Sequence, residues 1–259
     1  MRIRATVAAL SGALALSALA VPAAQADTAV GDTKITKVTV NGGKDIVVGT
    51  TAKKKVTIAI TATDPSGIVK IDGFLWHGSN FDNVDGSVVH PSDYRPSCTT
   101  VNATTKTCTI TLTVDPKKNL YDNSLAGSWK VLAAAHGSDG DKLVKDAYNT
   151  VRFQRASQLT VNASPEPVKK GKTITVTGAL TRANWDTSKY AGYTGQSVKL
   201  QFKKKGASSY STLKTVKSGS KGALKTTVKA SADGTFRYSF AGTSTTPAVN
   251  SAGDAIDVR

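Results

Sequence analysis

The chain has 259 residues and a formal net charge of +16 at neutral pH, from 34 Lys and Arg against 18 Asp and Glu. This excess of basic residues bears on solubility and association rather than on the fold, and it favours a polyanionic partner without identifying one. No stretch after residue 26 approaches the roughly 20 apolar residues of a membrane span, so the sequence predicts no span beyond that point.

The first 26 residues have the order of a secretory signal peptide. Arg2 and Arg4 precede an apolar run over residues 5–22, and Ala24 and Ala26 supply the small residues of a cleavage site. The run is short for a membrane-spanning helix, so we expect export and cleavage after Ala26. No Cys sits at the cleavage point and no wall-sorting motif occurs later, which favours a secreted, extracellular or loosely cell-wall-associated protein.

The remaining residues predict two β-rich domains, 27–157 and 158–259. In the first, strands are expected over residues 33–40, 46–48, 55–63, 68–76, 128–136 and 148–154, and a hairpin over residues 98–114. The clearest is the third, where Val56, Ile58 and Ile60 alternate with other residues as a half-buried antiparallel strand requires. Residues 77–96 are rich in Gly, Asn, Asp and Pro and are expected to form a long loop.

Cys98 and Cys108 are the 2 cysteines of the chain, and in an exported protein they predict a disulfide. A turn over residues 102–104 places them opposite each other in a hairpin. They are close in sequence, so the bond is a local staple and not the inter-sheet bond of antibody domains. In the chain-entropy model it contributes about 2.8 kcal/mol at most.

In the second domain, strands are expected over residues 159–161, 173–180, 195–206, 210–216, 224–228, 235–240 and 255–258. The third, GQSVKLQFKKKG, places Val198, Leu200 and Phe202 on one face and basic or polar residues on the other. Residues 181–194 hold Trp185 in polar surroundings and are expected to be a long connection.

Short strands at this spacing, without a helical period, indicate β-sandwiches. The second domain resembles the bacterial immunoglobulin-like domains of exported proteins from high-GC Gram-positive bacteria, in the segments GKTITVTGAL, YAGYTGQSVKLQFKKKG and GTFRYSFAGTSTTPAVNSAGDAIDVR. The first domain is similar to the same class through TATDPSGI, GSWKVLAAAH and TVRF. The predicted fold is therefore all-β, with two tandem immunoglobulin-like β-sandwich domains after an N-terminal signal peptide. Such domains serve as spacers, adhesins or accessory modules, and the resemblance implies no catalytic residues.

The sequence predicts no catalytic site, no metal site and no cofactor. Three histidines are the candidate acid–base groups: His77, His90 and His136. The chain has no G-x-S-x-G nucleophile elbow to pair with them. Four loop aspartates offer oxygen ligands to Ca²⁺: Asp64, Asp139, Asp141 and Asp146. The rest of a calcium-binding loop is missing, so we interpret them as turn-forming residues.

Eight lysines of the second domain carry the main functional prediction, a polyanion-binding surface: Lys199, Lys203, Lys204, Lys205, Lys214, Lys217, Lys225 and Lys229. Residues 158–259 hold 16 Lys and Arg against 5 acidic residues, a net of +11, whereas residues 27–157 hold 16 against 13, a net of +3. Ammonium groups along neighbouring strands attract phosphate or carboxylate polymers. The alternative is a solvated face that protects edge strands. Arg is scarce here, which argues against sequence-specific recognition of nucleic acid.

We therefore expect a secreted, non-catalytic binding or structural protein whose basic second domain associates with an anionic cell-wall or extracellular polymer. Two alternatives remain open. One is an accessory or inhibitor module for a secreted enzyme, which acts on that protein partner through the loops of residues 80–96. The other is a plain structural spacer.

Overall fold

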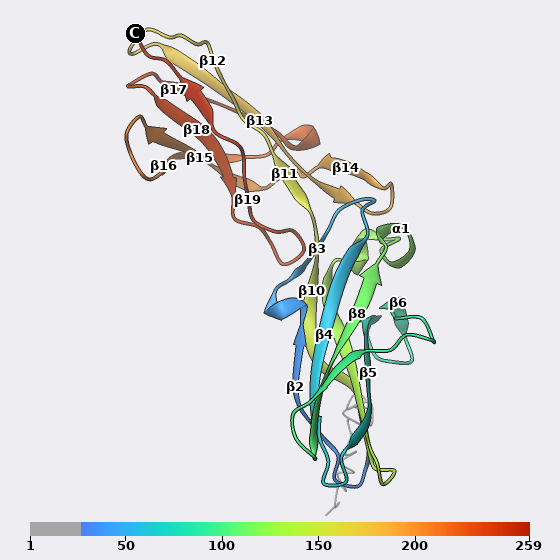
Figure 1. Cartoon of the computed structure of the whole chain (residues 1–259). Helices are drawn as coiled ribbons and strands as arrows, with labels where there is room; N and C mark the ends of the chain where they lie inside the picture. The colour runs from blue at the N-terminus through green and yellow to red at the C-terminus, as the bar shows by residue number, and fades with distance from the viewer. Residues whose placement is uncertain (1–26) are drawn as a thin grey trace, which may run out of the picture.

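The structure is a computed structural model that describes residues 27–259; the expected signal peptide lies outside the described residues. Two β-sandwiches lie end to end, and the C-terminus is at the far end of the second (Figure 1). Each has its own hydrophobic cluster, and strands dominate both, which confirms the all-β prediction. None of the helices within residues 27–259 is long and apolar enough to cross a membrane.

The first sheet of the first sandwich has the strand order β2-β4-β8-β7. Its strands are β2 (Lys34–Val40), β4 (Lys54–Thr63), β7 (Ser97–Thr100) and β8 (Thr105–Val114). The predicted alternation holds in β4, because Val56, Ile58 and Ile60 are all buried. In β8, Leu112 lies opposite Val56 and Ile110 opposite Ile58, so one face of this sheet is apolar along its whole length.

The second sheet of the first sandwich faces that apolar surface and has the order β1-β10-β9-β5-β6, with β3 also paired to β10. Its strands are β1 (Thr28–Val30), β3 (Ile46–Val48), β5 (Ile68–Gly78), β6 (Val84–Val88), β9 (Gly127–Gly137) and β10 (Lys142–Arg155). β3 runs parallel to β10, whereas the other neighbours are antiparallel.

The second sandwich is built around two central strands, β13 and β18. The first sheet joins β13 (Thr173–Asn184) to β11 (Ser157–Leu159), β12 (Asn162–Ser164), β14 (Lys189–Gly192) and β17 (Ala223–Lys229). The second has the order β16-β15-β18-β19, with β20 also on β18; its strands are β15 (Ser197–Lys204), β16 (Ser211–Lys217), β18 (Gly234–Phe240), β19 (Val249–Asn250) and β20 (Asp254–Ile256). Buried Tyr238 joins the two sheets, because its hydroxyl donates to the Val176 carbonyl at 3.0 Å.

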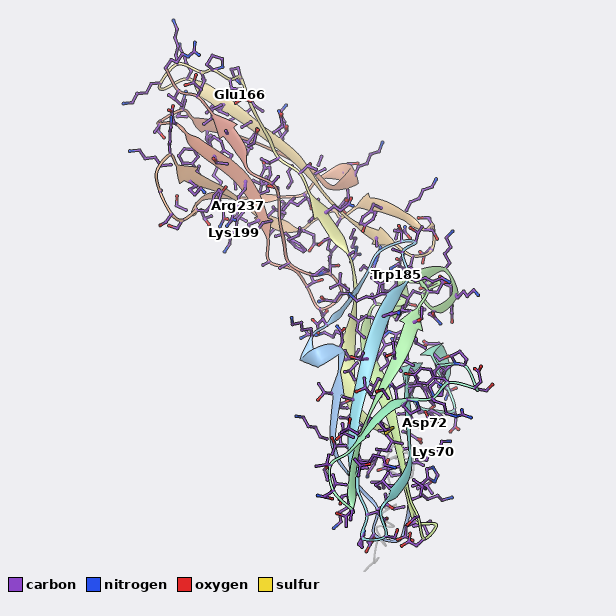
Figure 2. All side chains as sticks on the ribbon, viewed as in Figure 1. Lys70, Asp72, Glu166, Trp185, Lys199 and Arg237 are labelled. Carbon is purple, nitrogen blue, oxygen red and sulfur yellow. A yellow bond between two sulfur atoms is a disulfide. The ribbon has the colours of Figure 1, made fainter. Side chains whose placement is uncertain are left out.

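The expected long connection over residues 181–194 is wrong, because it is a hairpin in which β13 pairs with β14. Trp185 follows β13 directly and is buried in the hydrophobic cluster of the first sandwich, where its indole N–H donates to the Gly49 carbonyl at 3.0 Å. Figure 2 shows Trp185 where the two sandwiches meet. The residues on either side of Trp185 are polar, so the sequence did not indicate a buried position. Asn184 and Asp186 are polar because both accept hydrogen bonds from the side chain of Asn123 in the first sandwich, and the amide of Trp185 donates to that same side chain.

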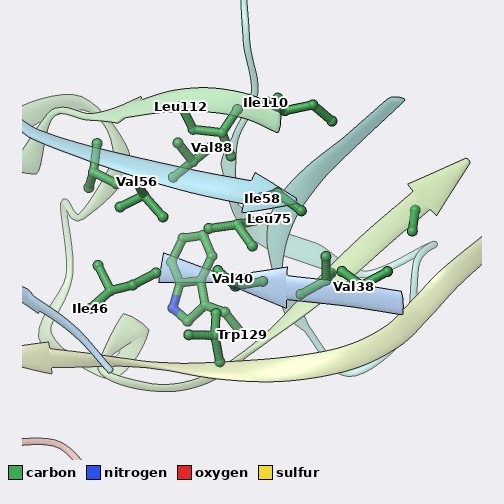
Figure 3. Packing of buried hydrophobic residues seen from close by; sticks show 14 of the residues in the cluster. Val38, Val40, Ile46, Val56, Ile58, Leu75, Val88, Ile110, Leu112 and Trp129 are labelled. Atoms are coloured by element: carbon green, nitrogen blue, oxygen red, sulfur yellow. The ribbon is translucent and has the colours of Figure 1, made fainter. Parts of the chain in front are cut away.

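The core of the first sandwich lies between its two sheets around Trp129 (Figure 3). The Trp129 ring stacks on Phe153 with their centroids 4.3 Å apart. The indole N–H of Trp129 donates to the Leu125 carbonyl at 2.7 Å, so the ring is buried without an unsatisfied polar group.

β5 is covered on both faces, which explains why apolar residues occur at both odd and even positions along it. Ile71 and Leu75 face the main core, and Phe74 and Trp76 face away from it. There they pack with Phe81, whose ring meets Trp76 edge-on at 5.4 Å. This second cluster binds the loop after β5 to the outer face of the sheet.

The expected loop over residues 77–96 is wrong in part, because it contains the edge strand β6, which pairs with the end of β5. The sequence signal for a strand is weak there because its central inward position is Gly86. A Cβ atom at Gly86 would lie 3.1 Å from the Trp129 ring, so the core leaves no room for a larger side chain.

The predicted disulfide between Cys98 and Cys108 is confirmed. It joins β7 to β8, where the two residues lie directly opposite each other with their Cα atoms 4.0 Å apart. The turn between the strands covers residues 101–104 and includes the expected residues 102–104. The disulfide therefore holds the edge strand of the first sheet to its neighbour.

Candidate anion-binding surface

The structure distributes the eight predicted lysines over three groups in the second sandwich and does not gather them on one face. Three lie on the outer face of the sheet β16-β15-β18: Lys199, Lys203 and Lys217. Two lie on the outer face of the opposite sheet, on β17: Lys225 and Lys229. The other three are at the ends and edge of the sandwich: Lys204, Lys205 and Lys214.

The register explains why the first group points outward. Val198 and Leu200 are fully buried, so Lys199 and Lys203 face solvent on the other side of β15. Lys217 lies opposite Ser197, which shares the outward parity of Lys199. The strand alternation read from the sequence is therefore correct here.

Arg237 belongs to the same outer face and is absent from the sequence prediction. It lies opposite Gln201 on the neighbouring strand β18. The signal was present in the sequence, since Phe236 and Tyr238 on either side are buried and force the residue between them outward. We call Lys199, Lys203, Lys217 and Arg237 together the basic face.

The guanidinium group of Arg237 is held in place by two neighbours. Its Nε donates to the side-chain oxygen of Gln201 at 2.8 Å, and its Cζ lies 3.8 Å from the centre of the Tyr210 ring. The ammonium group of Lys203 lies 5.2 Å from the same ring. Tyr210 thus brings two cations together without neutralising them.

No carboxylate neutralises the basic face. Within residues 27–259, none of its four cations forms an ion pair. Lys205 at the end of β15 differs, because its ammonium lies 3.5 Å from the Asp233 carboxylate. The pKa of Asp233 is lowered mainly by the amide of Val258, with a smaller contribution from Lys205. Figure 2 shows Lys199 and Arg237 close together on this sandwich.

The outer face of the opposite sheet carries fewer cations among threonines. Lys225 lies opposite Thr177, and Lys229 lies opposite Thr173, whose hydroxyl accepts a hydrogen bond from the Lys229 ammonium at 3.1 Å. These two lysines are four residues apart on one strand, as are Lys199 and Lys203 on β15. The chain therefore contains a matched pair of lysines on each side of the sandwich.

Two of the aspartates considered as calcium ligands come together in the first sandwich. Oxygens of Asp64, Asp141 and Asp32 lie within 4.8 Å of one another. Asp64 is buried, and its pKa is lowered because it accepts hydrogen bonds from the side chains of Ser66 and Thr33. These donors satisfy the buried carboxylate, which fits the structural role of a turn-forming aspartate.

Two histidines are paired with aspartates in the first sandwich. His77 Nδ1 lies 2.5 Å from Asp85, and His90 Nε2 lies 2.7 Å from Asp72. Within residues 27–259, no Ser, Thr or Cys side chain is hydrogen-bonded to either ring. The pairs therefore lack the nucleophile that an acyl-transfer site needs.

His90 lines a cavity of about 530 Å³ under the loop that follows β6. Lys70, Asp72, Tyr94 and Arg95 also line this cavity. The hydroxyl of Tyr94 accepts a hydrogen bond from the Thr111 amide at 2.7 Å, so the loop is fastened to β8. Because Asp72 lines this cavity together with Lys70 and Arg95, we expect it to select anions less strongly than the basic face does.

The order of the strands defines the class of protein. In the first sandwich, β2, β4, β8 and β7 correspond to strands A, B, E and D of the immunoglobulin fold, and β5, β9 and β10 to C, F and G. In the second, β12, β13 and β17 correspond to A, B and E, and β15, β18 and β19 to C, F and G. The chain is therefore two tandem immunoglobulin-like β-sandwiches, with its disulfide between strands D and E rather than B and F.

A scan against models of known protein families and a search of curated proteins both find no match. Among solved structures, the chain is similar to the D00-D0 domain of intimin, at 15% identity over 85% of this chain and 99% of that one, with a TM-score of 0.28. It is also similar to latent PorU from Porphyromonas gingivalis, at 13% identity over 89% of this chain, with a TM-score of 0.28; it spans 20% of the PorU chain. The polymeric Ig receptor ectodomain of a teleost fish has 15% identity over 86% of this chain and 98% of that one, with a TM-score of 0.25. TM-scores of this size support no conclusion about this chain, and the class given above rests on the strand order.

Proposed function

We propose that this is an exported, non-catalytic binding protein whose second sandwich associates with anionic cell-wall or extracellular polymers through the basic face. The observation that carries the proposal is the arrangement of four cations on one sheet surface, where no carboxylate of residues 27–259 forms an ion pair with them. Unpaired cations at a solvated surface attract polyanions, and each contact releases a counterion from the polymer.

The geometry of the sheet supports a polymer rather than a small anion. Lys199 and Lys203 are about 13 Å apart along β15, because a strand rises about 3.3 Å per residue. Arg237 lies between them on the neighbouring strand, opposite Gln201. Charges spaced in this way match a ligand that carries many charges along its length.

A matched pair of variants tests the basic face. The double variant Lys199→Gln, Lys203→Gln removes two charges from it, and Lys225→Gln, Lys229→Gln removes two from the opposite sheet. Binding of the full chain to purified bacterial cell walls and to dextran sulfate is measured over a salt series. We expect the first variant to lose about tenfold in affinity and the slope of log affinity against log salt to fall by about one to two units.

The control variant is expected to lose less than about threefold, because only long-range attraction changes there. Equal losses of affinity in the two variants would show that binding depends on the total charge of the domain, and would contradict a specific role of the basic face. Absence of retention by the wild-type chain at low ionic strength would eliminate polyanion binding altogether.

A second candidate function is recognition of a secreted enzyme by the first sandwich. It rests on the cavity of about 530 Å³, which Lys70 of β5 and Arg95 of the loop after β6 both line. Co-purification of a secreted hydrolase with the wild-type chain, and its loss in the Lys70→Ala, Arg95→Ala variant, would support this function. An unchanged set of partners in that variant would rule it out.

A further inference from the structure

The second sandwich has a groove of about 460 Å³ at its open edge, between β16 of one sheet and β17 of the other. Ile174, Phe202 and Phe236 form its apolar wall, and Lys214 and Lys229 line it together with residues 230–232. The groove is separate from the basic face, because β16 and β17 meet here at the side of the sandwich.

The groove exists because both strands are sheet edges. Among the described residues, β16 pairs only with β15 and β17 only with β13, so no strand covers the gap between the two sheets. Core side chains are consequently open to solvent: Phe202 and Val228 are only partly buried, and Leu213 is 44% exposed. Leu213 lies at an irregularity in the pairing of β15 with β16, which brings it to the edge.

Lys214 occupies a position where a core residue is expected. It lies opposite Leu200, which is fully buried, so its side chain starts on the inner face of the sheet. Its stem covers apolar surface, and its ammonium reaches across to the Thr227 carbonyl of β17 at 2.7 Å. Neither Lys214 nor Lys229 has a carboxylate partner within residues 27–259, and no acidic residue lines the groove.

We propose that this groove binds a small amphipathic anion, a single apolar chain with one carboxylate head group. The apolar chain lies against Phe202, Leu213 and Val228, where it covers core surface that is open to solvent. The carboxylate lies at the rim and accepts hydrogen bonds from Lys214 and Lys229. The groove thus combines an apolar slot of ligand size with two cations that have no anionic partner.

A compact ligand fits this groove better than a peptide strand or a polymer. A chain that ran along the free edge of β17 would meet the bridge from Lys214 to the Thr227 carbonyl and would have to break it. A ligand held on one side of this bridge leaves the hydrogen bond in place or exchanges it for a carboxylate contact. The lining therefore favours a medium-chain fatty acid over a peptide strand or a polymer.

The test uses decanoate as the probe and the full chain as the protein. Binding is measured by calorimetry and by methyl NMR, with decanol and decylammonium as probes of the same length but different charge. We expect decanoate to shift the methyl signals of Ile174, Leu213 and Val228 and to bind about tenfold more tightly than decanol, the value of one charge-assisted hydrogen bond. Decylammonium is expected to bind most weakly.

Three variants complete the test. Lys214→Gln removes the charge but keeps a polar hydrogen-bonding side chain, and it is expected to lose about tenfold in decanoate affinity but little in decanol affinity. Lys225→Gln, on the outer face of β17, is the matched control and is expected to bind as the wild type does. Ala232→Trp fills the groove and is expected to abolish binding of both probes.

The inference is overturned if decanoate shifts none of these methyl signals, or if decanol or decylammonium binds as tightly as decanoate. Equal affinity for decanoate in Lys214→Gln and the wild type also overturns it, and the variant is expected to fold because Lys214 is an exposed residue. These results are independent of polymer binding, because Lys199 and Lys203 lie outside the groove.

Discussion

His90 holds the loop after β6 through both of its ring nitrogens. Nε2 lies 2.7 Å from the Asp72 carboxylate and Nδ1 lies 2.8 Å from the Pro91 carbonyl. Both partners are acceptors, so both hydrogen bonds are made at once only when the ring is protonated. Burial on its own lowers the pKa of His90, but these two hydrogen bonds outweigh it and raise the pKa above the usual value of 6.5.

This raised pKa predicts that the first sandwich loses stability as pH rises. A group whose pKa is higher in the folded state stabilises it fully below the unfolded pKa, and the contribution disappears as pH rises through the folded pKa. We expect the free energy of unfolding in urea to fall by about 1 kcal/mol or less between pH 5.5 and 8 from this group. His90→Gln and Asp72→Asn are each expected to flatten that dependence. A wild-type slope retained in both variants would contradict the assignment.

At the level of elements, side chains protect the exposed edge of β6. The amide of Asn119, at the end of α1 (Pro116–Asn119), donates to the Ser87 carbonyl at 3.0 Å, and the Tyr121 hydroxyl donates to the Asp85 carbonyl. Both carbonyl groups belong to the edge strand of the sheet. The edge therefore offers fewer free acceptors to another strand.

The hairpin of β7 and β8 depends on its disulfide, because β7 has 4 residues and none of them is buried. We expect the Cys98→Ser, Cys108→Ser variant to lose at most about 2.8 kcal/mol of unfolding free energy in urea, from the extra freedom of the unfolded chain. The wild-type protein under reducing conditions is the matched control and is expected to lose the same amount. A much larger loss in the variant than on reduction would show that the serines disturb the hairpin.

The sequence predicted those elements whose two faces differ in polarity. β4, β8 and β15 alternate regularly, because one face meets a core and the other meets solvent. β6 and β14 were missed for different physical reasons. The inward position of β6 is a glycine beneath Trp129, and β14 is a hairpin strand with no buried residue.

The candidate site was only partly predictable. Alternation correctly placed Lys199, Lys203 and Arg237 on an outer face, although Arg237 was not singled out. Nothing in a single strand tells which sheet it joins, so the separation of Lys225 and Lys229 from the other lysines required the pairing of β17 with β13. Lys214 faces inward because it lies opposite buried Leu200 and shares the parity of Val216, which lies opposite Val198.

At the scale of the whole molecule, the two sandwiches share buried groups at their junction. Arg155 is 8% exposed, and its Nε donates to the Ala183 carbonyl at 2.6 Å. Burial, with a smaller contribution from nearby Arg182, lowers the pKa of Arg155 to about 10. Trp185 completes the first core from the other side. The junction is thus packed and hydrogen-bonded rather than a free linker.

This packing predicts that a mutation in the second sandwich destabilises the first. We expect Trp185→Ala to cost about 3 to 5 kcal/mol of unfolding free energy, because it leaves a cavity in the first core. Amide hydrogen exchange should accelerate in β3 and at Gly49. Trp185→Phe keeps much of the volume but loses the hydrogen bond to Gly49, and its expected loss is smaller. Unchanged exchange in β3 in the alanine variant would show that the two sandwiches are not coupled.

The position of Trp185 also has a consequence for the order of folding. A chain that emerges from its N-terminal end presents every strand of the first sandwich before residue 185 is available. The first core therefore lacks the Trp185 side chain, and is incomplete, until the β13–β14 hairpin has formed. Residues 27–157 make up a sandwich by strand pairing, but the last step in closing its core belongs to sequence that lies beyond it.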